Sequence, residues 1–383
     1  MTNVEIQQLH KDAVVSLSYV NPGIEYKKGG GVSARTYFTK RERWMEATIP
    51  MMRKGGVDLV VLSHGNPDPS RLPGAAGADC LLRCFDAMIQ EIERNRDLAL
   101  ILTRRDLDEA LRRGKMGIIF GVTCGPVDGD LATLRTLFRV GVRTAHPFGN
   151  DPKLGGSADG PKQHGLTRVG QAIICEMERL GMLVDLAHSN DRTFAEALRF
   201  AQKPVMDSHT NCRAIADYER CCTDDQLRII ARQGGVIGVH FGFVETMARV
   251  EDARYKRMMR AFRKKYAAMG RKYKDPYEFM SHRWDPAEWP RSLGGSVDDG
   301  TVIHRATIRQ LGDHIERMVN VAGIDHVCIG SDYSSGCMPE GVETAETLVN
   351  LTHEMAQRGF SAAEIKKIWG GNFVRLLRET LPA

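Results

Sequence analysis

Eight short apolar runs that alternate with helical patterns constrain the fold of this 383-residue chain more than any other feature. The runs lie at about 13–19, 57–63, 116–122, 142–146, 182–188, 204–208, 235–241 and 326–332. Helical spacing lies between them, near 39–54, 81–96, 105–113, 130–140, 166–180, 190–202, 223–233 and 304–322, and again near 341–358, 361–368 and 370–378. The alternation predicts βα units and a parallel sheet. Eight units favour a closed (β/α)8 TIM barrel of the α/β class, and no GxGxxG motif follows the first run to bind a dinucleotide.

The spacing of these runs predicts one domain over residues 1–383. No low-complexity segment or interdomain linker interrupts the pattern. The longest excursion, at about 243–303, follows the seventh predicted strand. A connection of that length at the catalytic rim is a candidate lid or oligomer contact.

Composition is that of a globular protein with a large core, since 42% of residues are hydrophobic and 26% are charged. No apolar run approaches the ~18 residues that cross a bilayer. The N-terminus has no basic segment followed by an apolar one, so we expect no signal peptide. The nine cysteines form no CxxC pair, which indicates reduced thiols and a cytoplasmic location.

Charge gives no sign of a nucleic-acid partner. The net charge is +5, and much of the basic excess lies within 249–274. Apolar residues recur at helical spacing in that segment, which indicates a solvated helix face. A nucleic-acid interface would need a recognised binding module around the basic residues. We therefore expect no nucleic-acid or membrane partner, and a homodimer as the commonest closed assembly.

Three apolar runs end in side chains that bind metals or carry protons. His188 ends the run 182–188, His209 follows the run 204–208, and Asp332 ends the run 326–332. In a (β/α)8 barrel the carboxyl ends of the strands surround the active site. These endings predict that the three side chains meet there, in a metal-dependent hydrolase.

Several motifs resemble the membrane (renal-type) dipeptidase family, peptidase family M19 of the amidohydrolase superfamily. They are Gly165-Leu166-Thr167-Arg168-Val169-Gly170, Glu176 to His188, Ser208-His209-Thr210-Asn211, Gly323-Ile324-Asp325-His326-Val327 with Gly330-Ser331-Asp332, and Trp369-Gly370-Gly371-Asn372-Phe373. The resemblance covers most of residues 10–380 in order. It implies an amidohydrolase-like barrel that cleaves dipeptides with two bridged zinc ions.

The resemblance also implies roles for four residues. His188 and His209 match the two histidines that hold the second zinc. Asp332 matches the aspartate of strand eight, which binds the first zinc and handles the proton of the attacking water. Arg220 matches the arginine that binds the substrate carboxylate, for which the forked guanidinium is well suited.

Other family positions hold different residues here. The His-x-Asp pair of strand one is replaced by Ser18 and Val20, and the bridging glutamate of strand three by Thr123. The histidine of strand four aligns with Gly149, while His146 lies three residues earlier. Three of the four ligands of the first zinc and the bridge are therefore missing, so we do not expect a dinuclear centre.

One divalent ion, zinc, remains compatible with the sequence, because a catalytic zinc needs three protein ligands and an open position. His188 and His209 supply two ligands. Cys124 or Asp332 is the candidate for the third, and His64 is a weaker one. A single ion would lower the pKa of its water, and Asp332 could take the proton. The alternative is a metal-free pocket in which the three strand-end groups form a hydrogen-bonded cluster.

These residues predict a dipeptidase-like hydrolase that cleaves an amide or related C–N bond in a small carboxylate-bearing substrate. The predicted substrate-binding residues are Arg220, His146 and Asn150. The alternatives are an isomerase, tautomerase or lyase on the same scaffold without metal, or a catalytically inactive homologue, because a fold alone does not fix a reaction.

Overall fold

The strands of the chain form a nearly closed parallel barrel. The computed structural model describes residues 1–41, 45–65, 75–123, 129–148, 153–158, 164–242, 244, 260, 264, 267–283, 306–333 and 338–383. The barrel strands are β1 (Val15–Val20), β4 (Val57–Gly65), β6 (Met116–Thr123), β7 (Val142–His146), β8 (Leu183–Val184), β9 (Met206–Thr210), β10 (Val236–His240) and β11 (Val327–Tyr333). They follow one another around the ring in chain order, and β1 pairs with both β4 and β11. The predicted fold class and all eight predicted barrel strands are confirmed.

The ring closes between β8 and β9 through a short contact. β8 has two residues, and a single bridge joins Asp185 to Met206. The Leu186 N–H donates to Met206 O at 2.8 Å. The Asp185 carboxylate adds a side-chain link, because its Oδ1 accepts the Ser208 N–H at 2.9 Å.

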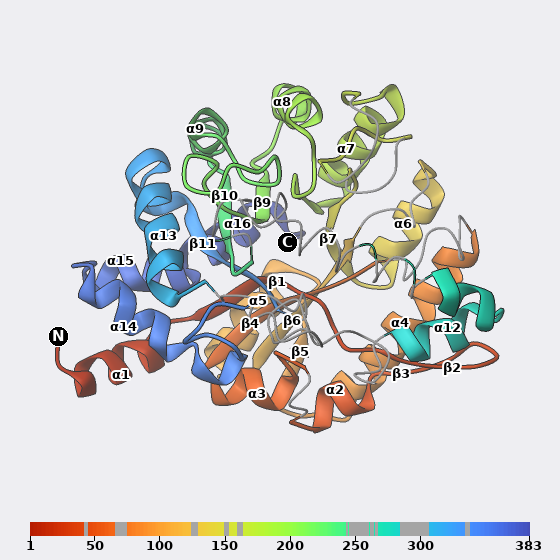
Figure 1. The fold of residues 1–383 in the computed structure, drawn as a ribbon, viewed down its shortest axis with the longest axis horizontal. Coiled ribbons are helices and arrows are strands. Elements are labelled where there is room, and N and C mark those ends of the chain that lie inside the picture. The colour runs from red at the N-terminus through yellow and green to blue at the C-terminus, as the bar shows by residue number, and fades with distance from the viewer. Residues whose placement is uncertain are drawn as a thin grey trace.

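Helices surround the strands (Figure 1). They are α1 (Asn3–Asp12), α2 (Arg35–Thr39), α3 (Ile49–Lys54), α4 (Ala75–Glu93), α5 (Arg104–Arg112), α6 (Leu131–Arg139), α7 (Arg168–Leu180), α8 (Asp191–Phe200), α9 (Asp224–Arg232), α12 (Pro276–Arg283), α13 (Ile308–Ala322), α14 (Val349–Gln357), α15 (Ala362–Lys366) and α16 (Asn372–Thr380). Threonine caps with a partner three residues on begin α5, α9 and α13, which satisfies free N–H groups of the first turn. None of the helices in the described ranges is long and apolar enough to cross a membrane.

Some elements differ from the sequence prediction. A hairpin of β2 (Glu25–Lys27) and β3 (Gly31–Ser33) follows β1, and β5 (Leu98–Leu100) pairs with β6 outside the ring. Each has three residues, too few to show a periodicity. The segment 39–54, predicted as one helix, instead holds the last residue of α2 and the whole of α3. A π-helical turn, η3 (Lys367–Gly371), joins α15 to α16, where Gly370 packs closely on Val14 O.

The core lies inside the barrel and between the barrel and its helices. Trp369 is among the largest fully buried side chains. Its Nε1–H donates to Thr352 Oγ1 at 2.8 Å, and its ring meets the edge of His10. Of the predicted 243–303 excursion, the described part includes α12, which packs on β2; most of the excursion lies outside the described residues.

Candidate functional site

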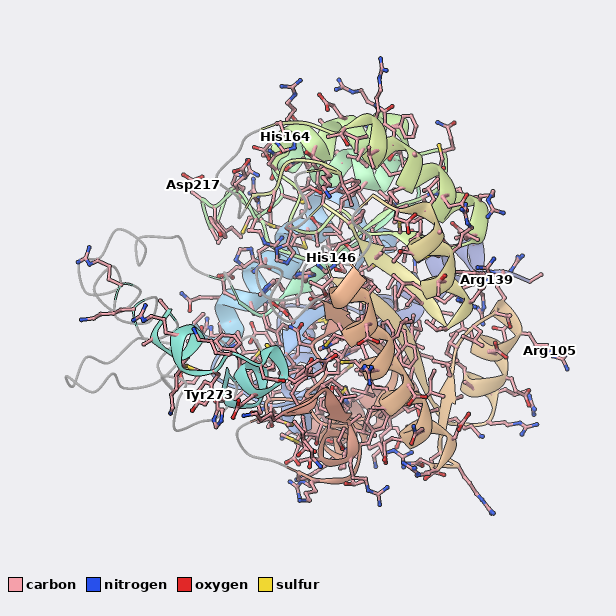
Figure 2. All side chains as sticks on the ribbon, turned by 90° about the vertical axis from the view of Figure 1, so that its right-hand side faces the viewer. Arg105, Arg139, His146, His164, Asp217 and Tyr273 are labelled. Carbon is pink, nitrogen blue, oxygen red and sulfur yellow. The ribbon has the colours of Figure 1, made fainter. Side chains whose placement is uncertain are left out.

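Four histidines meet at the carboxyl end of the barrel. His146 ends β7, His188 follows β8, His209 lies in β9 and His240 ends β10. Their ring centroids are 5.1 Å apart for His146 and His188, 5.1 Å for His188 and His209, and 5.5 Å for His209 and His240. In Figure 2, His146 lies inside the ribbon, between Arg139 at one end and the Asp217 and Tyr273 side chains at the other.

The structure brings His188 and His209 together, as the strand endings predict, and places His146, predicted as a substrate-binding residue, beside His188. It adds His240, which the sequence analysis missed and which lies next to the third strand-end residue, Asp332. The sequence contains the signal for His240, because this residue ends the apolar run Val236–Val239 in the same way that His188 and His209 end their runs.

His188 and His209 are arranged as a pair of metal ligands would be. Their Nε2 atoms are 3.1 Å apart. Zinc–nitrogen bonds of about 2.0–2.1 Å at a tetrahedral angle would separate two nitrogens by about 3.3 Å. The other ring nitrogen of His209 contacts Ser208 Oγ at 2.7 Å, the kind of outer contact that orients a ligating imidazole. The separation is that of a hydrogen bond between the two rings, and it is also compatible with two ligands of one ion.

Burial keeps His209 neutral. Loss of solvent, followed by the positive charge of Arg220 and by the neighbouring histidines, holds the pKa of His209 well below its usual value. A neutral imidazole has a lone pair with which to bind a metal or accept a proton. The effect of Arg220 also shows that its guanidinium, on a side chain only 5% exposed, lies near this site.

Asp332 accepts a hydrogen bond at one oxygen and lies at ion-pair distance from a histidine at the other. Asn21 Nδ2 donates to Oδ1 at 2.7 Å, and His240 Nε2 lies 3.0 Å from Oδ2. The Gly242 N–H donates to His240 Nδ1 at 2.6 Å, so that nitrogen is an acceptor. The proton of a neutral His240 therefore lies on Nε2, next to the carboxylate.

Strand β1 places different side chains at the mouth from those that the sequence alignment indicates. Ser18 donates to Ser208 O at 2.9 Å inside the barrel, and Val20 is buried. The Tyr19 ring stacks on His209 with centroids 3.9 Å apart, and its hydroxyl contacts Thr123 Oγ1 at 2.9 Å. The pairing of β1 with β11 shifts register between Tyr19 and Val20. The match to the family's His-x-Asp pair pointed to Ser18 and Val20 and is wrong by one residue, because beside this irregularity the side chains of Tyr19 and Asn21 face the mouth.

The first metal position of the family is not built here. Tyr19 and Asn21 occupy the mouth on β1, where Tyr19 bonds Asn21 and Thr123. Asn21 in turn bonds Asp332, whose other oxygen lies next to His240. Within the ranges that the structure describes, no group of three or more His, Cys, Asp or Glu side chains is arranged to hold one ion.

A buried carboxylate orients the imidazole of His146. Asp185 Oδ2 lies 3.6 Å from His146 Nδ1, and Oδ1 accepts the N–H groups of Ala187 and Ser208. Burial alone would raise the pKa of Asp185, but the interactions with His146 and Ser208 outweigh it and lower that pKa. Asp185 therefore carries negative charge beneath the histidines.

A second carboxylate, Asp207, lies next to Asp185 and was not predicted as a site residue. Burial and the charge of Asp185 raise the pKa of Asp207 to about 7. The Cys222 thiol donates to its Oδ2 at 3.3 Å, while Oδ1 has no hydrogen-bond partner among the described residues. Like charges that share a buried space ionise unequally, which accounts for the opposite shifts of the two carboxyl groups.

The backbone is strained next to the site. Among the described residues, the non-glycine positions with positive φ are His188 at 66°, Ser331 at 63° and Asp332 at 60°. Such conformations cost of order 1 kcal/mol or more each and concentrate at functional sites. The strain lies on two of the three residues that the strand endings singled out.

Of the other predicted residues, two cannot be placed and one lies apart from the four histidines. Cys124 and Asn150 lie outside the described residues. His64 contacts Tyr26, whose hydroxyl lies 2.8 Å from His64 Nε2, and no ring contact joins it to the four histidines in the described part of the structure.

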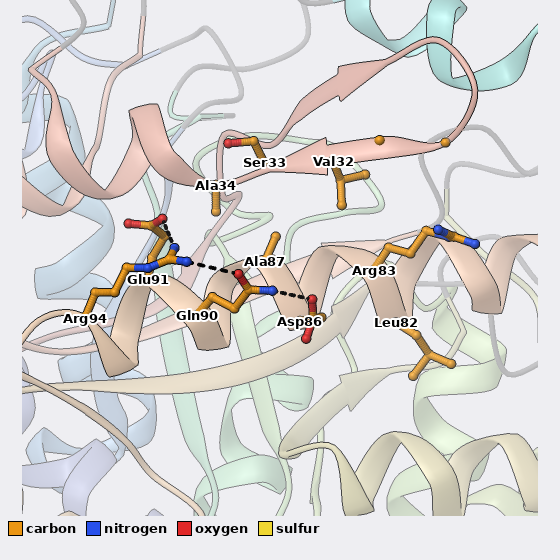
Figure 3. Close-up of a pocket in the computed structure, with 12 residues that line it drawn as sticks. Val32, Ser33, Ala34, Leu82, Arg83, Asp86, Ala87, Gln90, Glu91 and Arg94 are labelled. Atoms are coloured by element: carbon orange, nitrogen blue, oxygen red, sulfur yellow. Dashed lines mark hydrogen bonds and ion pairs between the residues drawn. The ribbon is translucent and has the colours of Figure 1, made fainter.

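A separate hollow of about 480 Å³ lies outside the barrel, between the β2–β3 hairpin and α4 (Figure 3). Its polar groups bond one another: Gln90 donates to Asp86 at 2.7 Å, and Arg94 donates to Glu91 at 2.7 Å. None of the four histidines lines it. The barrel mouth, and not this hollow, carries the reactive side chains.

Comparison with known proteins shows the family of the chain and supports the barrel fold. The sequence model of the membrane dipeptidase family, peptidase family M19, matches residues 2–382. The probable dipeptidase PvdM of Pseudomonas aeruginosa is similar in structure over 99% of this chain and 98% of its own, with a TM-score of 0.74 and 21% identity. A metallo peptidase from Rhodobacter sphaeroides, liganded with a phosphinate mimic of the dipeptide L-Ala-D-Ala, is similar over 96% of this chain and 99% of its own, with a TM-score of 0.71 and 18% identity. An amidohydrolase from Pseudomonas aeruginosa is similar over 98% and 99%, with a TM-score of 0.68 and 20% identity.

Proposed function

We propose, since this chain belongs to the membrane dipeptidase family (peptidase family M19), that it hydrolyses an amide or related C–N bond in a small substrate with a free carboxylate. The observation that carries the proposal is the pair of Nε2 atoms of His188 and His209, 3.1 Å apart at the barrel mouth. Family membership makes hydrolysis the expected reaction, whereas substrate and metal use are the parts proposed here.

His188 and His209 would hold one divalent ion, zinc, and Cys124 stays the predicted third ligand. When bound, the ion supplies a Lewis acid that polarises the scissile carbonyl or the attacking water. The low pKa of His209 keeps a lone pair available for this role. The outer contact with Ser208 fixes the direction of the imidazole.

Asp332 would move the proton. It accepts a proton from water as the water oxygen bonds to the carbonyl carbon, and it returns that proton to the leaving nitrogen as the C–N bond breaks. Arg220 would bind the substrate carboxylate, because a buried guanidinium attracts an anion strongly. His146, stacked on His188 and oriented by Asp185, would contact the substrate carbonyl.

A metal-free reaction is the second candidate, and one observation favours it: no three ligands converge in the described part of the structure. The histidines and Asp332 would then move protons in an isomerase, tautomerase or lyase. A homodimer and a cytoplasmic location stay predictions.

Metal analysis combined with a hydrolysis assay tests the proposal. The protein is purified without added zinc, its metal content is measured, and L-Ala-D-Ala, other dipeptides and N-acyl amino acids are offered with and without a chelator. We expect about one equivalent of divalent ion, and hydrolysis that stops when the chelator removes it. His188→Ala and His209→Ala should lose both.

The control variant is His326→Ala, because His326 contacts Gly235 O before β11 begins, away from the mouth. It should keep both ion and activity. Hydrolysis that survives chelation and His188→Ala would contradict the metal-dependent mechanism, whereas a protein with neither bound metal nor hydrolysis would favour the metal-free isomerase, tautomerase or lyase. Absence of hydrolysis in all these substrates with added zinc would contradict the hydrolase proposal.

A further inference from the structure

A row of hydrogen-bonded side chains crosses the barrel mouth where the family resemblance implies a metal ion. Ser63 Oγ and Thr123 Oγ1 are 2.9 Å apart, and Thr123 Oγ1 lies 2.9 Å from the Tyr19 hydroxyl. The Tyr19 hydroxyl donates to Asn21 Oδ1 at 3.3 Å. Asn21 Nδ2 then donates to Asp332 Oδ1 at 2.7 Å. We call Ser63, Thr123, Tyr19 and Asn21 the polar row; its members come from β4, β6 and β1 and the residue after β1.

The direction of every hydrogen bond in the polar row is fixed by the Asp332 carboxylate at one end of the row. A carboxylate oxygen only accepts, so the Asn21 amide turns its NH2 toward Asp332 and its oxygen toward Tyr19. The single hydroxyl hydrogen of Tyr19 is used on Asn21, so Thr123 must donate to Tyr19. Ser63 must donate to Thr123 by the same reasoning. All the donors therefore point toward Asp332, and such aligned bonds polarise one another.

The second oxygen of Asp332 faces a histidine whose proton position is also fixed. The Gly242 N–H holds His240 Nδ1 as an acceptor, which leaves the proton on Nε2 beside Oδ2. Asn211 secures this turn, since its Nδ2 donates to His240 O at 3.0 Å and to Gly242 O at 2.7 Å. A side chain at Gly242 would come within 2.6 Å of the His240 ring, so the close approach requires glycine there.

We propose that the polar row, together with His240, replaces the first metal ion of the family and orients the Asp332 carboxylate for proton transfer. In this chain Asp332 is then a proton acceptor and not a ligand, and the mouth holds at most one divalent ion. Asn21, Tyr19 and His240 are positioning residues that act through Asp332. This inference rests on the proposed hydrolysis for its kinetic test.

Variants that remove single donors test the row. Asn21→Leu removes the donor to Oδ1, and His240→Leu removes the imidazole that lies 3.0 Å from Oδ2. Each should lower kcat about 100-fold, the usual cost of a misplaced catalytic group, with KM changed less than about threefold. His240→Gln keeps an N–H donor and should recover to within about tenfold of the unmodified protein. Tyr19→Phe should lower kcat about fivefold, because Tyr19 contacts Asp332 only through Asn21.

The zinc content of the variants shows whether Asn21 and His240 position Asp332 or instead support a metal ligand. The unmodified protein should bind no more than one equivalent of zinc even in excess metal, and Asn21→Leu, His240→Leu and Asp332→Asn should keep that equivalent. Asn350→Leu is the matched control, because Asn350 is exposed on α14 and donates to Gly341 O. A second tightly bound ion, or loss of the single ion in Asn21→Leu, would overturn the inference, as would an unchanged kcat in Asn21→Leu.

The nitrogen-15 NMR spectrum of the imidazoles tests the position of the His240 proton, and it needs neither substrate nor metal. We expect His240 to carry its proton on Nε2, with a signal that moves in Asp332→Asn. A proton on Nδ1 would overturn the inference. If the unmodified protein neither binds zinc nor hydrolyses any substrate while His240 keeps this form, the proposed function fails and the arrangement at Asp332 stands.

Discussion

Replacing Asp207 by asparagine should change the pH dependence of stability in a defined direction. Asp207 is buried, and burial together with the charge of Asp185 raises its pKa from the usual 3.8 to about 7. The folded state thus holds a proton that the unfolded state releases. The contribution of Asp207 to stability is complete below the usual pKa and is lost as pH rises through about 7. The amide of the Asp207→Asn variant does not titrate, so the variant lacks this loss.

The size of the effect follows from the two pKa values. One pKa unit corresponds to about 1.4 kcal/mol, so the whole shift from 3.8 to about 7 is worth roughly 4 kcal/mol. Between pH 5 and pH 8, integration over the two titrations gives roughly 2–3 kcal/mol. The hydrogen-bonding cost of the amide itself does not depend on pH, so it cancels when the change with pH is compared.

Urea denaturation of both proteins at pH 5, 6, 7 and 8 measures this difference. The stability of Asp207→Asn relative to the unmodified protein should rise by about 2–3 kcal/mol over that range. Asp225→Asn is the control, because Asp225 is 88% exposed and should give a difference that does not change with pH. A flat difference for Asp207→Asn, or one that falls as pH rises, would refute the assignment of a raised pKa to this carboxyl group.

Three further changes test the packing and hydrogen bonding of the barrel. Trp369→Ala should lower the free energy of unfolding by about 3–5 kcal/mol, because it empties a fully buried site and frees Thr352; a loss below about 1 kcal/mol in urea denaturation would contradict this. Asn372→Leu should cost about 1–3 kcal/mol in the same assay, since Asn372 Nδ2 donates to the carbonyls of Ile324 and Val327, and an unchanged midpoint would be inconsistent with those bonds. Thr307→Ala should cost about 1 kcal/mol by loss of the cap of α13, visible as a lower thermal midpoint, whereas Thr307→Ser should keep it.

The fold could be predicted from the sequence because its signal is repeated. Each barrel strand is an apolar run that follows a helix, and the same pattern occurs eight times, so an error in one unit leaves the others intact. The hairpin at 25–33 and the three-residue strand β5 have no such repetition and were missed.

The candidate site was predicted in part, for a physical reason that differs between residues. His188 and His209 close apolar runs, and a strand that ends in a barrel mouth delivers its next side chain there. His240 also closes an apolar run, but the family resemblance assigns no ligand role to that position and therefore does not indicate it. Tyr19 and Asn21 depend on an irregular register of β1, which no periodic pattern indicates.

Asp207 shows a different limit of sequence analysis. It lies two residues before His209 inside β9, where a carboxylate has no local feature that distinguishes it from any other polar residue. Its raised pKa arises from burial and from Asp185, which is distant in sequence and adjacent only after the barrel has closed. Electrostatic coupling of this kind depends on three-dimensional placement.

The contact between β8 and β9 is the weakest in the barrel described above, so a ligand bound at the mouth should stabilise the closed barrel. The barrel is fastened there by one backbone bridge and the Asp185 carboxylate, and His188 and His209 stand on opposite sides of this contact. Any molecule or ion bound by both imidazoles would link β8 to β9 and hold the barrel closed. At about 100 times its Kd, such a ligand would stabilise the folded protein by about 2.7 kcal/mol. Resistance to heat and proteolysis should then follow the concentration of whatever the mouth binds.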